Sequence, residues 1–342
     1  MAPTAASSPY IIGIGAANAD VHGQSRGAVN LRDSNPGTMR VSAGGVTRNI
    51  LENAARLGLD AQLVSAVGGD VFGRLILARS AAAGMDARLI SAVGGDAFGS
   101  MILARSAAAG VNVENVLVLP DAASSTYMTV LEPSGEMFVA VSDMSILSRL
   151  PEDYLAARAE LLRGAAALVC DPSLPEATLD CLLSLAGETP VFVDPVSTSY
   201  AKKLAGRVGR FHTVKPNRME LSVLAGMEVE GDVALKRAIA RLLGKGCRRV
   251  YVTFGPDGCC YGDASGLFLH AKLRPIARMA NASGAGDAFT AAAIYGHVRG
   301  LPPEETLYLA LAAGSVAIQS TETVNPNFCL SALADTLAHD RL

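Results

Sequence analysis

Tryptophan is absent from this chain of 342 residues, and aromatic residues make up only 5% of it. The six cysteines include no C-x-x-C pair, and no histidine lies near them at ligand spacing. This pattern argues against a structural zinc site and against a disulfide framework. We therefore expect reduced thiols, most of them in the core.

Charge is also scarce in this chain. Charged residues account for 18% of it, the formal net charge is -3, and no block of Lys or Arg stands out, which gives little support to a nucleic-acid partner. No apolar run approaches the roughly 18 residues needed to cross a bilayer. Residues 1–9 lack the basic and apolar regions of a signal peptide. We expect a cytoplasmic protein with a flexible segment at 1–9 and no membrane or nucleic-acid partner.

Hydrophobic residues are plentiful, at 50% of the chain, which allows a substantial core. A β-branched run from Tyr10 ends in glycines and predicts a buried strand. Similar runs alternate with Ala- and Leu-rich helical patterns, at 166–170, 191–194, 212–214 and 250–253. The alternation predicts one α/β domain over 10–342, with a mostly parallel sheet between helices. Ligands would bind beyond the carboxyl ends of its strands, where Asp194, 215–217 and 253–255 lie.

A second, smaller β-structure is indicated near the middle of the chain. Two β-rich runs, 126–131 and 137–141, are joined by Glu-Pro-Ser-Gly-Glu, a turn signal that predicts a hairpin. The run 39–43 could add a further strand. We expect a small β-lid, formed by about 20–43 and 124–143, that stands off the main sheet.

A tandem repeat of 26 residues is the most unusual feature of the chain. Residues 63–88 are followed at once by 89–114, and 18 of the 26 aligned positions are identical. Each copy has the pattern of one strand, a Gly-Gly-Asp turn and one helix closed by glycine. Two copies are too few for a solenoid, so we interpret the repeat as a duplicated βα unit. One copy is surplus to the fold and should lie at a sheet edge or loop out, and the sequence leaves open which copy this is.

The strongest chemical motif is Gly284-Ala285-Gly286-Asp287, which precedes an Ala-rich helical pattern. Glycines at a helix N-terminus let an anion approach unpaired backbone N–H groups at the positive end of the helix dipole. Asp287 beside this cradle could deprotonate a hydroxyl while the amides hold the charge of a phosphoryl group. An acidic residue is also common in a first helical turn for dipole reasons alone. The G-x-x-x-x-G-K-[ST] loop is absent, which argues against a Walker-type kinase.

Three motifs, in the expected order, resemble those of the ribokinase-like, or PfkB-type, sugar and nucleoside kinases. They are Gly44-Gly45 with Asn49, Asn217 with Glu220, and the run from Gly284 to Asp287. The resemblance spans about 10 to 327. It implies a three-layer αβα sandwich with a β-lid, ATP-dependent phosphorylation of an alcohol, and Mg²⁺ as a cofactor. It also implies a homodimer formed through the lid, and it leaves a monovalent cation such as K⁺ open.

The resemblance assigns substrate contacts to the N-terminal motifs. Gly44 and Gly45 would let the backbone approach the hydroxyls of the substrate, and Asn49 would hold a ribose hydroxyl. A helix-opening turn would explain the same three residues. Asn18 and Asp20, which follow the first strand, would hold polar edges of the substrate, and their alternative is a role as turn formers.

Metal and nucleotide contacts fall in the second half of the chain. Asn217 and Glu220 would position Mg²⁺ beside the phosphates of ATP, since Mg²⁺ prefers oxygen ligands. A helix capping box would explain the same pair. Candidates for the nucleotide side are Thr253, Gly255 and Gly258 under the phosphates and ribose, and Asn325 beside the adenine. Both of these segments could instead be plain loops.

Several segments resemble one subgroup of the family, the pseudouridine kinases. The polar candidates there are Asp33, Ser34, Asn35 and Thr126. They suit a uracil ring, which offers carbonyl acceptors and N–H donors. The resemblance implies transfer of the γ-phosphoryl group of ATP to the 5′-hydroxyl of pseudouridine, with Asp287 as base and 284–286 as anion hole. Two alternatives stay open: a kinase for another nucleoside or for ribose, and a catalytically silent binding protein.

Overall fold

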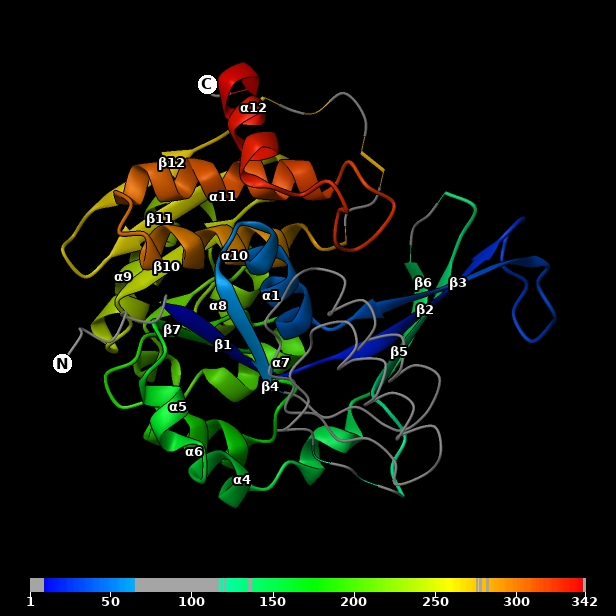
Figure 1. The fold of residues 1–342 in the computed structure, drawn as a ribbon. Helices are drawn as coiled ribbons and strands as arrows, with labels where there is room; N and C mark the ends of the chain where they lie inside the picture. Colours follow the sequence, from blue (N-terminus) through cyan, green and yellow to red (C-terminus); the bar gives the residue numbers. More distant parts are fainter. Residues whose placement is uncertain are drawn as a thin grey trace, which may run out of the picture.

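Two sheets of different size organise the part of the chain that the computed structural model describes (Figure 1). That part comprises residues 9–64, 117, 119, 121–134, 137–274, 276, 279–280 and 283–340. The larger sheet has eight strands and lies between helices, and the smaller sheet has four strands and lies to one side. The α/β sandwich with a separate β-lid, expected from the sequence, is confirmed.

Most strands of the large sheet are parallel. In spatial order they are β12 (Phe268–Ala271), β11 (Cys259–Asp263), β10 (Arg249–Thr253), β9 (Thr213–Val214), β8 (Val191–Val193), β7 (Ala167–Cys170), β1 (Tyr10–Ile14) and β4 (Asp60–Val64). The strands from β10 to β4 are parallel, and β11 and β12 return antiparallel. Every residue of β7 and β8 is buried and apolar, as expected for a parallel sheet that is covered on both faces.

Helices cover both faces of this sheet because its strands bury side chains on both sides. Val250 and Val252 belong to one hydrophobic cluster and Tyr251 to another, and successive side chains of a strand point to opposite faces. The first cluster packs under α4 (Glu152–Ala156), α5 (Ala159–Arg163), α6 (Glu176–Leu185), α7 (Thr198–Leu204), α8 (Arg218–Ala225) and α9 (Gly231–Gly244). The second packs under α10 (Ala285–Val298), α11 (Pro303–Ala317) and α12 (Leu330–Asp340), and α1 (Val46–Arg56) lies against α10. None of the described helices is long and apolar enough to span a membrane.

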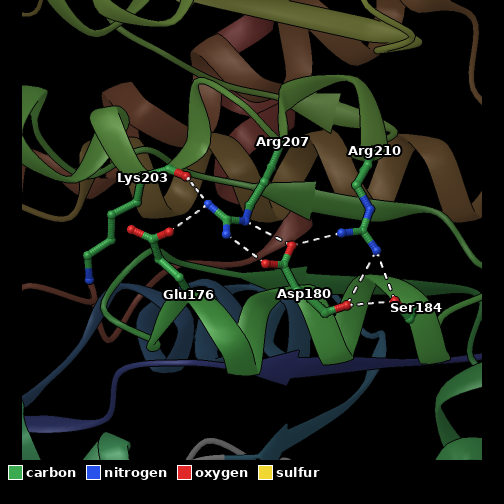
Figure 2. A network of polar contacts seen from close by, with 6 residues as sticks. All are labelled: Glu176, Asp180, Ser184, Lys203, Arg207 and Arg210. Atoms are coloured by element: carbon green, nitrogen blue, oxygen red, sulfur yellow. Dashed lines mark hydrogen bonds and ion pairs between the residues drawn. The ribbon is translucent and has the colours of Figure 1, made fainter.

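Three short 3₁₀ turns complete the described helices: η1 (Ser145–Arg149), η2 (Val208–Arg210) and η3 (Gly255–Asp257). A charged network fastens η2 to α6 (Figure 2). Arg207 donates from Nε and Nη2 to the two carboxylate oxygens of Asp180, at 2.8 and 2.6 Å. Arg207 also pairs with Glu176, and Arg210 pairs with Asp180. Because bidentate contacts of this kind fix orientation as well as distance, the network holds the two segments in register.

The smaller sheet is the lid. Its strands, in spatial order, are β3 (Gly37–Gly44), β2 (Asn18–Ser25), β5 (Thr126–Leu131) and β6 (Met137–Asp143). β5 and β6 form the antiparallel hairpin expected from the turn signal, and β3 is the expected further strand. Asn18 pairs with Gly44 at the end of the lid that meets the main body, and Ser25 pairs with Gly37 at the outer end.

The tandem repeat lies almost wholly outside the described residues. Only Leu63 and Val64, which begin its first copy, are described, and they end β4. Among the described strands, β4 is the outermost on its side of the large sheet. The position of the surplus copy therefore stays a prediction, as do the single domain over 10–342 and the flexible segment at 1–9.

Candidate active site

The N-terminus of α10 forms a cradle of small residues, Gly284 to Gly286. Gly284 has a φ of 81°, a left-handed conformation that favours glycine, and a side chain there would collide with the backbone of Thr323. At Gly286 a Cβ atom would lie 2.7 Å from Nζ of Lys215. The first N–H groups of a helix have no partner within the helix. The half-buried residues 284–286 thus offer backbone donors beside a buried ammonium group.

Asp287 lies in the first turn of this helix and is 8% exposed. Its Oδ2 accepts a hydrogen bond of 2.9 Å from Nδ2 of Asn49. Burial and the nearby Asp194 carboxylate raise the pKa of Asp287 to about 7, although the hydrogen bond from Asn49 and the charge of Lys215 oppose the shift. A buried carboxyl with a pKa near neutral is suited to accept a proton at physiological pH.

Asn49 reaches Asp287 because Gly45 lets the start of α1 approach the loop after β1 closely. Gly45 has a φ of 100°, and a side chain there would overlap the backbone of Ala16, in the loop after β1. The close approach lets the backbone N–H of Arg48 donate to the carbonyl of Ala16 at 3.2 Å. The expected helix-opening turn is therefore present, and it also places Asn49 at the carboxyl of Asp287.

Asn18 and Asp20 open strand β2 and are buried, so they are not turn residues. Nδ2 of Asn18 donates to Oδ1 of Asp20 at 2.7 Å. A Cβ atom at Gly44 would fall on the Asp20 carboxylate, so glycine gives this group its room. Burial raises the pKa of Asp20 to about 6, and the charge of Asp20 contributes to the raised pKa of Asp287. The two carboxyls therefore interact where the lid meets the large sheet.

Thr126 also lies at this inner end of the lid. It opens β5 opposite Ala19 in the register with β2, one position from Asp20. Its Oγ1 donates to the carbonyl of Ser124 at 3.3 Å. The structure thus brings Thr126 close to the residues of β2 that were expected to hold the substrate.

The structure places Asp33, Ser34 and Asn35 away from this group. They lie in the exposed connection between β2 and β3, the blue loop at the outer tip of the lid in Figure 1. The amide of Asn35 donates to two carbonyls of its own loop, both at 3.0 Å. Strand β2 has eight residues between this tip and its inner end, which corresponds to roughly 25 Å at about 3.3 Å per residue. Within one chain these three residues therefore lie far from Asp287, which corrects the expectation of a single cluster.

Lys215 and Asp194 form a buried ion pair that the sequence analysis left without a role. They follow β9 and β8, and Nζ of Lys215 lies 2.6 Å from Oδ2 of Asp194. Burial lowers the pKa of Lys215, but the charges of Asp194, Glu220 and Asp287 outweigh this effect and raise it above its usual value. The lysine therefore stays charged beside the α10 cradle. The signal that could have identified the pair is its place at the carboxyl ends of neighbouring parallel strands.

Asn217 and Glu220 form a complete capping box at the start of α8. Oδ1 of Asn217 accepts from the Glu220 N–H, and Oε2 of Glu220 accepts from the Asn217 N–H, both at 2.9 Å. This is the alternative that their spacing left open. Glu220 is nevertheless buried, and its Oε1 takes no part in the box. One such oxygen fits Mg²⁺, which commonly binds one or two carboxylates together with phosphates and waters, whereas the oxygen of Asn217 is engaged in the cap.

The nucleotide candidates lie in two loops. Thr253 ends β10 and forms a β-bridge with Asn217, which places it next to α8. Gly255 and Gly258 have φ values of 59° and 90° and hold the η3 turn. In the second loop, Nδ2 of Asn325 donates to a carbonyl of α11 at 2.7 Å and its Oδ1 accepts from the backbone two residues on. The side chain of Asn325 thus fastens its own loop, and its place beside adenine stays a prediction.

Comparison with known proteins places this geometry in a family. The family model described as pfkB family carbohydrate kinase matches residues 8–88 and 80–328. The first match ends at the last residue of the first repeat copy, and the second match includes the whole second copy. The pseudouridine kinase of Escherichia coli K12 is 34% identical over 323 residues, which cover 94% of this chain and 94% of that protein. YeiI, an uncharacterized sugar kinase of the same strain, is 29% identical over 317 residues, or 93% of this chain and 80% of that protein.

Among solved structures, Arabidopsis thaliana ribokinase complexed with ribose and ATP superimposes with a TM-score of 0.78 at 22% identity. The match covers 96% of this chain and 99% of that chain, and it supports the assignment of the fold. The fold, the motifs and the matched length agree: the chain belongs to the pfkB family of carbohydrate kinases, has the ribokinase-like fold, and is a kinase of a sugar or nucleoside.

Proposed function

We propose that this kinase transfers the γ-phosphoryl group of ATP to the 5′-hydroxyl of pseudouridine, giving pseudouridine 5′-phosphate and ADP. The observation that carries the proposal is the buried carboxyl of Asp287, held by Asn49 beside the N–H groups that open α10. The choice of acceptor is supported by the 34% identity to a pseudouridine kinase over nearly the full length of both chains.

Asp287 acts as the general base in the proposed reaction. Its carboxylate takes the proton of the acceptor hydroxyl as the hydroxyl oxygen bonds to the γ-phosphorus. The bond from the γ-phosphorus to the bridging oxygen breaks, and that oxygen leaves with its electron pair as part of ADP. The N–H groups of 284–286 and Nζ of Lys215 hold the charge on the phosphoryl oxygens. The proton on Asp287 passes to solvent after the product leaves.

The acceptor would bind at the inner end of the lid. The carboxylate of Asp20 and the amides of Asn18 and Asn49 are buried donors and acceptors for ribose hydroxyls. Gly44 and Gly45 let the backbone approach the same hydroxyls, and Thr126 in the neighbouring strand is placed for a polar edge of the base.

The nucleotide would lie across the ends of β9 and β10. Thr253, Gly255 and Gly258 would contact its phosphates and ribose. Glu220 would hold Mg²⁺ through Oε1, and the ion, when bound, would neutralise phosphate charge. A requirement for K⁺ stays a prediction, and rates measured in K⁺ and in Na⁺ at equal ionic strength would decide it.

The decisive experiment is an acceptor panel with coupled detection of ADP and ³¹P NMR of the products. Pseudouridine, uridine, inosine and ribose are the acceptors, and 5′-deoxypseudouridine is the matched control that lacks the reacting hydroxyl. We expect the highest kcat/KM for pseudouridine, a 5′-phosphate as product, and inhibition without turnover by the deoxy compound. Equal rates for ribose and pseudouridine would remove the nucleoside assignment. Tight binding of ATP and pseudouridine by calorimetry without any product would instead support a silent binding protein.

The lid provides the surface for the homodimer that we propose for this chain. Its register puts five apolar side chains on one face of the sheet: Met39, Val41, Met128, Val139 and Val141. All five are between 41% and 71% exposed. An apolar sheet face of this kind is unusual on a monomer and typical of an interface, and two copies could cover it face to face.

A further inference from the structure

A buried chain of hydrogen bonds runs along α1 to the catalytic carboxyl. Nη2 of Arg48 donates to Oε2 of Glu52, and Nη1 of Arg48 donates to Oδ1 of Asn49 at 3.0 Å. Nδ2 of Asn49 then donates to Oδ2 of Asp287 at 2.9 Å. All four residues are buried, and Arg48 is only 1% exposed. Arg48 lies inside the run from Gly44 to Asn49 and Glu52 follows it, but the resemblance assigned neither residue a role.

This chain decides which way the Asn49 amide faces. An asparagine amide carries an oxygen acceptor and an NH₂ donor in nearly the same shape, so either group could face Asp287. A guanidinium has only donors, so its contact with Asn49 requires the oxygen. The NH₂ group is then left for Asp287, and it can donate to the ionised carboxylate. A reversed amide would present its oxygen and favour the protonated carboxyl.

We propose that Arg48 and Glu52 are positioning residues for the general base: they fix the side-chain amide of Asn49 so that its NH₂ group, not its oxygen, faces Asp287. Glu52 holds the guanidinium of Arg48, and Arg48 holds the oxygen of Asn49. This inference rests on the proposed role of Asp287 as base.

Stability alone is a weak explanation for the Arg48–Glu52 pair. Both side chains are almost fully buried, and a buried ion pair often contributes no more stability than apolar residues of similar volume. The same carboxylate has a second partner on the surface side, because Arg56 pairs with Oε1 of Glu52 at 2.9 Å. Arg56 continues to the carbonyl of Pro326 and does not touch Asn49. Arg56 is therefore a control residue on the same helix: it belongs to the same network but lacks the contact with Asn49.

The other charged groups around Asp287 come from different elements. Asp194 follows β8, Lys215 follows β9, and Asp20 opens β2, and all three act on the pKa of Asp287. Substitutions on α1 leave them in place. Arg48 also lowers the pKa of Asp20 through its charge, so an Arg48 variant reduces the charge on Asp20. That change would lower the pKa of Asp287, whereas a reversed Asn49 amide would raise it, so a rise in the pKa of Asp287 is assigned to the amide.

The test compares Arg48→Met with Arg56→Met. For each variant, the acid limb of the pH profile of kcat/KM is measured with the best acceptor, and the pKa of Asp287 is measured by ¹³C NMR of the carboxyl groups, with Asp287→Asn identifying its signal. We expect Arg48→Met to raise both values by about one unit, the size of one hydrogen bond to a charged group. Since about half of Asp287 is ionised at pH 7 in the native protein, kcat/KM at pH 7 should fall about fivefold with that shift. Arg56→Met should leave both values unchanged.

Conservative and double variants separate positioning from folding. Arg48→Lys keeps one donor and should give an intermediate shift. Glu52→Gln should shift the limb in the same direction, and it preserves side-chain volume if Arg48→Met does not fold. In an Asn49→Ala background, Arg48→Met should cause no further rise in the pKa of Asp287, because the rise passes through the amide.

Two results would overturn the inference. One is an equal shift from Arg48→Met with and without Asn49, and the other is a shift from Arg56→Met as large as that from Arg48→Met. Near-normal turnover by Asp287→Asn would instead contradict the base assignment. The pKa of Asp287, measured by NMR in the Arg48 and Arg56 variants, would still test the role of Arg48.

Discussion

The chemistry of single residues in this site is governed by an excess of buried carboxylates. Asp194, Glu220 and Asp287 all act on the charge of Lys215, the one lysine among them. Burial makes each ionised carboxylate costly, and neighbouring carboxylates add to that cost. The same excess is suited to a cationic ligand, and it keeps Asp287 close to the point at which it gains or loses a proton.

Replacing Asp287 with asparagine should inactivate the enzyme and stabilise the fold. We expect kcat to fall by about 10²- to 10⁴-fold, the usual contribution of general base catalysis, with a much smaller change in KM. The pKa of Asp287 is about 7 in the folded protein and 3.8 in the reference state. The unfolded chain therefore ionises first, and the fold loses stability as pH rises from 3.8 to about 7, above which the loss is complete. The variant should therefore melt several degrees higher than the native protein at pH 8, with a smaller difference at pH 5. Normal turnover, or a lower melting temperature at pH 8, would contradict this account.

The rate should also fall in acid because Asp287 reacts as the carboxylate. Its pKa is raised to about 7 by burial and by Asp194, so kcat/KM should drop about tenfold for each pH unit below this value. The profile is measured with saturating ATP in buffers of constant ionic strength. A rate that is unchanged between pH 8 and pH 5.5 would show that no group of this kind limits the reaction.

At the scale of elements, the N-terminus of α8 combines a structural and a chemical role that mutation can separate. Asn217→Ala removes one half of the capping box and should lower the free energy of unfolding by about 1 kcal/mol. Glu220→Gln can keep the box, because glutamine also accepts from the backbone, but it removes the charge proposed for Mg²⁺. We expect this variant to keep its melting temperature and to need at least about tenfold more Mg²⁺ for half-maximal rate. An unchanged Mg²⁺ requirement would assign Glu220 to capping alone.

The C-terminal end of α10 packs on the sheet through a histidine pair. His297 lies 4.9 Å from His212 and 5.4 Å from Phe192 between ring centroids. Burial and the charge of Arg249 lower the pKa of His297 to about 4. In the unfolded chain the pKa of His297 returns to its usual value of 6.5. The unfolded chain is therefore protonated first, and the folded protein loses stability as pH falls from about 6.5 to 4.

Comparison with His297→Phe isolates this effect. The variant keeps an aromatic ring beside Phe192 and cannot be protonated. The free energy of unfolding of the native protein minus that of the variant should decrease as pH falls from 7 to 4. Urea titrations across this range provide the measurement, and the difference cancels carboxylates such as Asp287 that titrate in both proteins. A difference that does not vary with pH would mean that His297 is protonated equally in both states.

At the scale of the whole molecule, the lid links the active site to assembly. Its inner end carries Asp20, and one of its faces carries the exposed apolar side chains. Val141→Asp places a charge on that face and should convert a dimer to a monomer in light scattering coupled to gel filtration. Leu31→Asp, which changes a still more exposed apolar residue outside the lid strands, is the control and should leave the mass unchanged. A native protein of monomeric mass, or a Val141→Asp protein that stays dimeric, would refute the lid interface.

The sequence by itself determined those features that depend on residues close together in the chain. Alternating apolar runs predicted the parallel sheet, the turn signal predicted the lid hairpin, and the glycines before Asp287 predicted the start of α10. Each depends on a local pattern, because strand and helix periodicities and the steric freedom of glycine operate within a few residues. The order of three such motifs was enough to indicate the family.

Only the tertiary structure decided how these pieces meet. Asn49 and Asp287 are 238 positions apart, and their contact depends on how α1 packs on α10, which no local pattern specifies. Packing likewise paired Lys215 with Asp194, turned Arg48 inward to Asn49, and put Asp33 to Asn35 at the far tip of the lid. Burial then set the pKa of Asp287, because a carboxyl loses its hydration only when the whole fold closes around it.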